Sequence, residues 1–320
     1  MTWTAQIAIP VGQLPSWHAL LDHIESVLDT EVRADEGCER LAAMDETGVS
    51  WLPWPTKSFE LYVPGVSTRG MRVSAELRGT IIEVEVAQRS LATWSDWQLA
   101  VECACALGEF AGAPVRVDGR SEHSSDDLRT RFLDDDDRYL DECREGAKGL
   151  GHLIQASGSN VHLEGPAGCA VIGQRTWARL QRVAMDDDDL AARLIDAALS
   201  SIEARGFEDL HQANPMEFRG ASGQSVVALV LSPEQPTLLR NADFVLISPD
   251  IEGSPGTTMY LLPIESLDAA FPGSTTWLDD RCCALAALPR ERWTERFARI
   301  RPLLLPLDEV LSSEPAKTGH

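Results

Sequence analysis

Several residue types and motifs that would report on function are scarce or missing in this chain. Aromatic residues make up 6% of its 320 positions, and only three of its 28 basic residues are lysines. It contains no CxxC, HExxH, GxSxG, GxGxxG or GxxxxGK[ST] pattern. These absences remove the usual signatures of structural zinc, zinc proteases, α/β-hydrolases and nucleotide-binding loops. We therefore expect no cofactor and no metal, and the sequence favours a non-catalytic protein.

Long apolar runs are also missing. The start of the chain has no basic segment ahead of an apolar one, and Pro10 interrupts its first strand-like stretch. The most apolar stretch, 99–113, is interrupted by Glu102 and Glu109 and is too short to span a bilayer. We therefore expect neither a signal peptide nor a membrane span, and place the protein in the cytoplasm.

Positive charge is in deficit. Fifty acidic residues against 28 basic ones give a formal net charge of −22 at pH 7. Such a charge repels nucleic acids and anionic membranes and attracts basic proteins. A hydrophobic fraction of 44% is nevertheless typical of a folded globular protein. The excess of arginine over lysine indicates a GC-rich bacterial gene.

The cysteines do not form a recognisable framework. Seven positions, an odd number, are cysteine: Cys38, Cys103, Cys105, Cys143, Cys169, Cys282 and Cys283. None of the spacings suits a zinc site, so we expect reduced thiols. The adjacent pair near the end of the chain is expected to fill a core.

Periodicity predicts an α+β protein whose N-terminal domain, 1–120, is ferredoxin-like. Alternation predicts strands and helical spacing predicts helices, in the order strand 4–10, helix 14–28, strand 59–63, hairpin 71–87, a helix after Thr93 and strand 114–117. Thr93 and Asp96 form a capping-box pattern at the start of the second helix, and Gly112 marks its end. The βαββαβ order is that of a ferredoxin-like sandwich.

The remainder is predicted to hold a connecting helix and a second α+β unit. The connecting segment is 121–148, with one long helix from Ser124, and the second domain is 149–311. Its expected elements are strands 161–163, 170–172, 226–231, 244–247 and 259–262 with helices 189–205 and 290–301. The polar tail 312–320 is expected to be disordered.

Two runs of four aspartates, Asp134–Asp137 and Asp186–Asp189, are the main candidates for chemistry. The first resembles the aspartate-rich helix of terpene synthases, but the rest of that metal motif and its aromatic richness are missing. We expect the second run to cap the helix that follows it. The first run is expected on a solvated helix face, where Asp134, Asp135, Asp136 and Asp137 are the predicted partner-binding residues.

The histidines give weaker signals. His18 and Asp22 lie four apart on a predicted helix, but two ligands make an incomplete metal set. The isolated histidines, among them His123 and His162, are expected to be surface or structural residues.

In general character the chain resembles the immunity proteins of bacterial polymorphic and type VI secretion toxins. The segments that carry the resemblance are TWSDWQLAVECACALGEFAGAPVRVDG at 93–119 and FPGSTTWLDDRCCALAALP at 271–289. It implies a non-catalytic protein that neutralises a toxin by direct binding, and a net charge of −22 would steer it to a basic partner. Two alternatives stay open: a hydrolase or transferase that uses Asp and His residues from distant segments, and an adaptor or chaperone for an effector.

Overall fold

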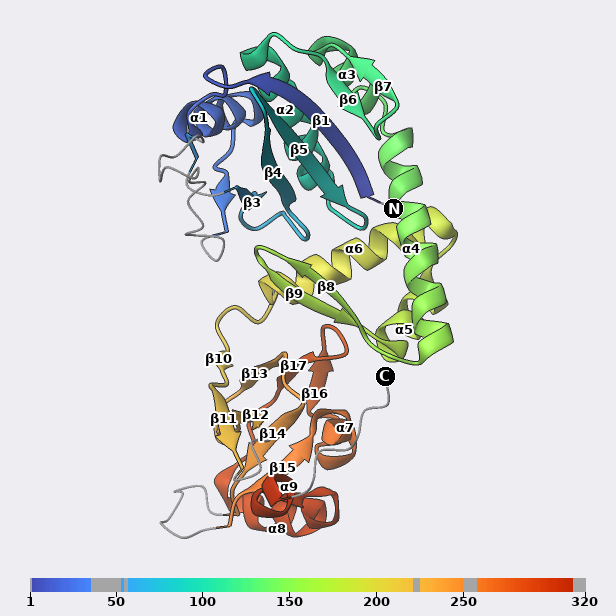
Figure 1. Cartoon of the computed structure of the whole chain (residues 1–320). Coiled ribbons are helices and arrows are strands. Elements are labelled where there is room, and N and C mark those ends of the chain that lie inside the picture. Colours follow the sequence, from blue (N-terminus) through green and yellow to red (C-terminus); the bar gives the residue numbers. More distant parts are fainter. Residues whose placement is uncertain (1, 36–52, 55–56, 221–224, 250–257, 313–320) are drawn as a thin grey trace. The chain divides into compact units, whose positions relative to one another are not determined.

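A computed structural model of the protein describes residues 2–35, 53–54, 57–220, 225–249 and 258–312. The chain is a mixed α+β protein, as predicted, and divides into two units, Met1–Ile202 and Glu203–His320 (Figure 1). Of the tail predicted to be disordered, all but Ser312 lies outside the described residues.

An antiparallel sheet of seven strands forms the first part of the first unit. In spatial order the strands are β2 (Arg33–Ala34), β3 (Ser58–Tyr62), β4 (Met71–Arg78), β5 (Ile81–Arg89), β1 (Thr2–Pro10), β6 (Val115–Val117) and β7 (Ser121–His123). All their pairings are antiparallel. In β1, Ile7 and Ile9 are buried whereas Gln6 and Ala8 are exposed, so one face of the sheet supports a core and the other meets solvent.

The ferredoxin-like arrangement predicted for 1–120 is not confirmed. Four strands, β2, β3, β4 and β5, lie between the first two helices, and β5 then pairs with β1. A ferredoxin-like unit has two strands at this place and four strands in its sheet. The sheet observed here has seven strands, because β2 and β3 extend it beyond β4 and β7 extends it beyond β6.

Two helices with well-defined ends accompany this sheet. α1 (Trp17–Leu28) begins after Ser16, whose hydroxyl accepts a hydrogen bond from the backbone N–H of Ala19. α2 (Trp94–Ala111) starts with the predicted capping box. It ends at Gly112, which has the left-handed conformation (φ 59°) that glycine adopts without steric cost.

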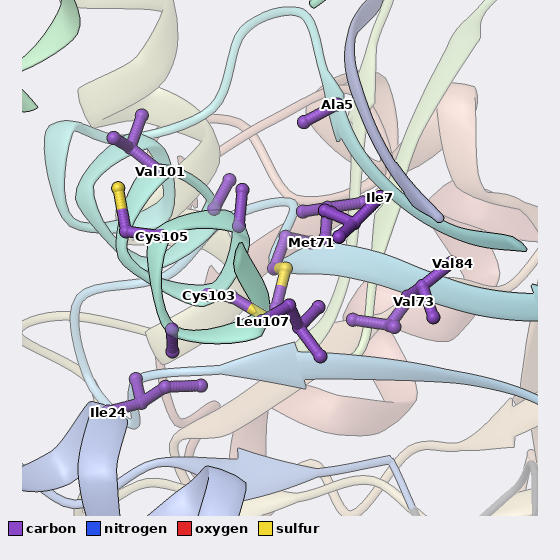
Figure 2. Close-up of a cluster of buried hydrophobic side chains, with 14 of the residues drawn as sticks. Ala5, Ile7, Ile24, Met71, Val73, Val84, Val101, Cys103, Cys105 and Leu107 are labelled. Carbon is purple, nitrogen blue, oxygen red and sulfur yellow. The ribbon is translucent and has the colours of Figure 1, made fainter. Parts of the chain in front are cut away.

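The core of this part lies between α2 and the sheet. Figure 2 shows Cys103 and Leu107 of α2 among side chains of the strands, including Met71 and Val84. Neighbouring elements cover α2 on most sides, and its residues from 99 to 108 are all buried. Such a helix needs no polar face.

The prediction of a single helix from Ser124 to residue 148 is wrong. Two helices occupy this stretch, α3 (Ser125–Phe132) and α4 (Asp137–Ser157). Between them the backbone N–H of Asp137 donates to the Asp135 carboxylate at 3.0 Å. Aspartate side chains that bond local backbone groups in this way compete with helical hydrogen bonds, and the run of aspartates therefore interrupts the helix.

α4 belongs to a second core within the first unit. This core also contains β8 (Val161–Gly165), β9 (Gly168–Ile172), α5 (Gln174–Val183) and α6 (Asp187–Glu203). Leu91, which follows β5, joins the same cluster, and Tyr139 Oη donates to Ala92 O at 3.2 Å. The first unit therefore extends to Ile202, past the division that the sequence places after residue 148. Helix α5 was not predicted.

The second unit contains two sheets and short helices. One sheet has the order β10 (His211–Gln212), β13 (Thr237–Arg240), β17 (Cys282–Leu285) and β16 (Thr275–Trp277). The other has the order β11 (Pro215–Arg219), β12 (Ser225–Val230), β14 (Phe244–Ile247), β15 (Tyr260–Pro263) and β18 (Leu305–Pro306). The helices are α7 (Leu267–Ala270), α8 (Arg290–Ile300) and α9 (Leu307–Ser312). Cys282 and Cys283 are buried, as predicted.

Candidate functional site

The aspartate run between α3 and α4 is an exposed junction rather than part of a helix face. We call Asp134–Asp137 the acidic junction. All four side chains are exposed, and within the described residues none of them forms an ion pair. Their negative charges are therefore not neutralised by ion pairs.

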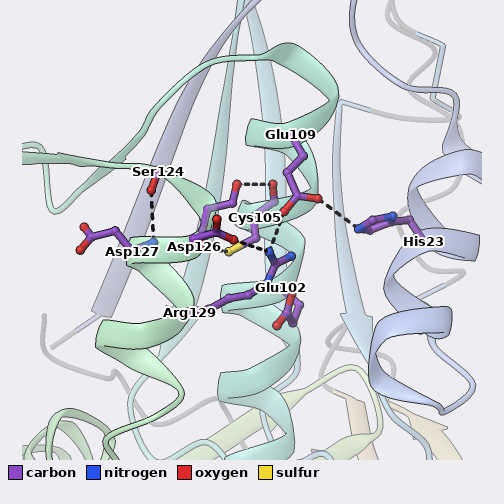
Figure 3. A network of polar contacts seen from close by, with 9 residues as sticks. His23, Glu102, Cys105, Glu109, Ser124, Asp126, Asp127 and Arg129 are labelled. Carbon is purple, nitrogen blue, oxygen red and sulfur yellow. Dashed lines mark hydrogen bonds and ion pairs between the residues drawn. The ribbon is translucent and has the colours of Figure 1, made fainter.

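Two basic residues near the acidic junction are paired elsewhere. Arg129 donates to Glu102 at 2.9 Å and to Glu109 at 2.7 Å, and Arg138 lies 3.4 Å from Asp118 (Figure 3 shows the Arg129 group). Partial burial lowers the pKa of Arg129, but the hydrogen bonds that it donates to the two glutamates outweigh this effect and raise its pKa above the ordinary value.

Two hydrogen bonds hold α3, the helix that precedes the acidic junction, against α2. Trp97 Nε1 donates to Phe132 O at 2.8 Å, which fixes the last turn of α3. Ser125 Oγ donates to Cys105 O at 3.0 Å, which fixes its first turn against α2. Both bonds connect α3 to a buried helix, so the aspartates that follow α3 are presented from a fixed support.

A groove of about 460 Å³ opens near the other end of α3. It is lined by Gly108, Glu109, Gly112, Ala113, Pro114, Ser124, Ser125 and Asp126. The groove lies between the last turn of α2, whose carbonyl groups carry partial negative charge, and the first turn of α3, whose N–H groups carry partial positive charge. Its two acidic lining residues are already paired with Arg129, which lies 2.7 Å from Glu109 and 3.8 Å from Asp126. These carboxylates are therefore not free to bind a basic side chain from another protein.

The second aspartate run has the capping role predicted for it. The backbone N–H of Asp189 donates to Asp186 at 2.8 Å, and that of Met185 donates to Asp189 at 2.9 Å. Cations neutralise the rest of the run, with Arg144 at 2.7 Å from Asp188 and Arg193 at 2.8 Å from Asp189. Hydrogen bonds from these arginines lower the pKa values of Asp188 and Asp189.

His123 is a buried histidine with hydrogen bonds at both ring nitrogens. Its Nε2 lies 2.7 Å from Ser121 Oγ, and its Nδ1 is hydrogen-bonded to the Asp127 carboxylate. The order Ser–His–Asp is the one used by serine hydrolases. Ser121 and His123 are alternate residues of one strand, and alternate residues share a face, which is the sequence signal that could have shown the pair. Ser121 and Asp127 are both accessible to solvent.

Two groups of side chains in the described part of the chain have the proximity needed to hold a metal ion. The ligand atoms of each group lie within 4.8 Å of one another; the groups are Asp135, Asp136 and Asp137, and His162, Glu164 and Cys169. His18 and Asp22, which the sequence suggested as an incomplete metal set, belong to neither group.

Comparison with protein-family models, with curated proteins and with solved structures gives no match for this chain. Among the described helices, none has both the length and the apolar character that crossing a membrane requires.

Proposed function

We propose that this chain is a cytoplasmic immunity protein that neutralises a basic toxin by binding it through the acidic junction. The observation that carries the proposal is the acidic junction itself, Asp134–Asp137, whose four exposed carboxylates have no cationic partner among the described residues. Toxins that attack nucleic acids are commonly basic near their active sites. A binding partner of charge −22 is steered to such a surface and excludes the anionic substrate from it.

Charged contacts at the rim accelerate association, whereas packed anchors at the centre of an interface supply most of the affinity. The acidic junction is therefore assigned to encounter and orientation.

Replacing Asp134, Asp135, Asp136 and Asp137 with asparagine should slow association about ten-fold or more at low salt, and less at high salt where charges are screened. The partner to test is the product of the gene adjacent in the source genome, with rates measured by stopped-flow fluorescence. Folding should be unaffected because all four side chains are exposed.

The matched control is the same substitution at Asp186, Asp187, Asp188 and Asp189, which changes net charge by the same amount. These residues cap α6 and pair with arginine, so the control should lower the thermal midpoint and leave association nearly unchanged. Equal slowing by the two variants would show a net-charge effect and contradict a binding role for the acidic junction.

A hydrolase is the second candidate, and the Ser121–His123–Asp127 chain of hydrogen bonds favours it. With Nδ1–H directed to the carboxylate, Nε2 is placed to take the Ser121 proton. Replacing Ser121 with alanine should then lower hydrolysis of p-nitrophenyl acetate about 100-fold or more, because the nucleophile is lost. Ser124→Ala removes a nearby hydroxyl that caps α3 and should keep the activity. Wild-type turnover no faster than that of Ser121→Ala excludes this candidate.

A further inference from the structure

The β8–β9 hairpin brings together the side chains of His162, Glu164 and Cys169. His162 and Glu164 are alternate residues of β8 and so share a face of the hairpin. Cys169 is paired with Glu164 across the ladder, which places its side chain on that same face. Imidazole, carboxylate and thiol groups thus converge within 4.8 Å.

The hairpin that carries these groups is held on its other face and at its tip. Leu163, Ala170 and Ile172 are buried in the core formed with α4, α5 and α6. At the tip, a Cβ added to Gly165 would lie 2.2 Å from Thr68 O, so only glycine allows this close approach. Arg89 Nη1 adds a hydrogen bond to Glu164 O at 3.0 Å. The three side chains therefore start from fixed backbone positions.

The distance between the sulfur of Cys169 and the nearer ring nitrogen of His162 matches a tetrahedral metal site. Cys169 Sγ lies 3.8 Å from His162 Nδ1. Zinc bound at about 2.3 Å to sulfur and about 2.05 Å to nitrogen holds these two atoms about 3.6 Å apart at a tetrahedral angle. Thiolate and imidazole together are the ligands that zinc-like ions prefer over magnesium or calcium. The group of three aspartates in the acidic junction has neither a thiolate nor an imidazole.

We propose that His162, Glu164 and Cys169 form a binding site for a divalent transition metal ion of the zinc class. Three protein ligands leave the fourth position to water or to a donor from another molecule, as in open zinc sites. His162 and Glu164 are exposed, so an ion reaches the site from solvent.

Two arginines lie near the hairpin. Arg89 pairs with Glu60, and Arg69 has Glu60 and Asp96 as electrostatic neighbours. These carboxylates reduce the repulsion that the two guanidinium groups exert on an incoming cation.

Cobalt(II) titration of the full chain tests the site, because Co²⁺ replaces Zn²⁺ and reports its ligands by absorption. We expect a sulfur-to-cobalt charge-transfer band and the intense visible bands of tetrahedral Co²⁺, both saturating at one equivalent and lost when Zn²⁺ is added. Cys169→Ser should abolish the charge-transfer band, although six other cysteines remain. His162→Ala should weaken Co²⁺ binding about ten-fold or more.

The control variant is Asp135→Asn with Asp136→Asn, which removes the other acidic group and should leave both bands unchanged. Circular dichroism of each variant checks that the fold is kept, as expected for side chains on the outer face of the hairpin. No charge-transfer band in the wild type, or a band that persists in Cys169→Ser, overturns the proposal. Its outcome is independent of toxin binding, which concerns the acidic junction.

Discussion

Asp96→Ala should lower the free energy of unfolding of the first unit by about 3–5 kcal/mol, the range for removing one partner of a buried charged network. Asp96 is fully buried and its carboxylate accepts hydrogen bonds from the backbone N–H groups of Thr68, Arg69, Gly70 and Thr93 at 3.0 to 3.1 Å. Alanine leaves these donors buried without an acceptor, and each such donor costs about 1–3 kcal/mol before relaxation.

Urea unfolding followed by hydrogen exchange measures the effect and locates it. Exchange should accelerate in peptides from the first unit, whereas the second unit, with a core of its own, serves as the internal reference. The control is Asp126→Ala, whose side chain is 99% exposed and which should unfold at the wild-type urea concentration. Equal midpoints for the two variants would contradict the role given to Asp96.

Trp97→Ala should destabilise the first unit by about 3–5 kcal/mol, the range for truncating a buried aromatic residue. The ring is 2% exposed and lies among those of Trp3, Phe132 and Tyr139, with centroids 5.6 to 6.2 Å away. Its loss also frees the last turn of α3, which the indole N–H holds through Phe132 O.

The conservative variant Trp97→Phe separates packing from hydrogen bonding. It keeps most of the apolar contact and should cost less than Trp97→Ala, with a remaining loss of about 1 kcal/mol for the missing N–H donor. Urea unfolding of both variants makes the comparison. A smaller loss for alanine than for phenylalanine would show that packing of this ring does not stabilise the unit.

Local signals in the sequence predicted those elements whose causes are themselves local. The capping box of Thr93 and Asp96 and the stop at Gly112 place α2 correctly, since each acts within one helical turn. The cap at Asp186 was predicted for the same reason. Strand pairing is not local. The sequence predicts a strand at 59–63, but it does not show that this strand pairs with β4 and extends the sheet beyond it.

The candidate sites also differ in whether their residues are neighbours in the sequence or meet only in the fold. The acidic junction is visible in the sequence as four aspartates, although its charges do not reveal that the helix stops there. His162 and Cys169 look isolated because they meet only when the β8–β9 turn closes and sets the register. Asp96 was recognised as a helix cap, whereas its bonds to 68–70 bridge more than 25 residues and leave no periodic trace.

The sheet of the first unit also bears on how the protein behaves at high concentration. Among the described strands, the two at the edges of this sheet are very short: β2 has two residues and β7 has three. Charged side chains occupy both edges, Arg33 on one and Glu122 on the other. Short, charged edges offer few free backbone groups to a second sheet and so resist edge-to-edge aggregation. In the immunity role proposed above, this feature would keep the protein dispersed while it accumulates ahead of its target.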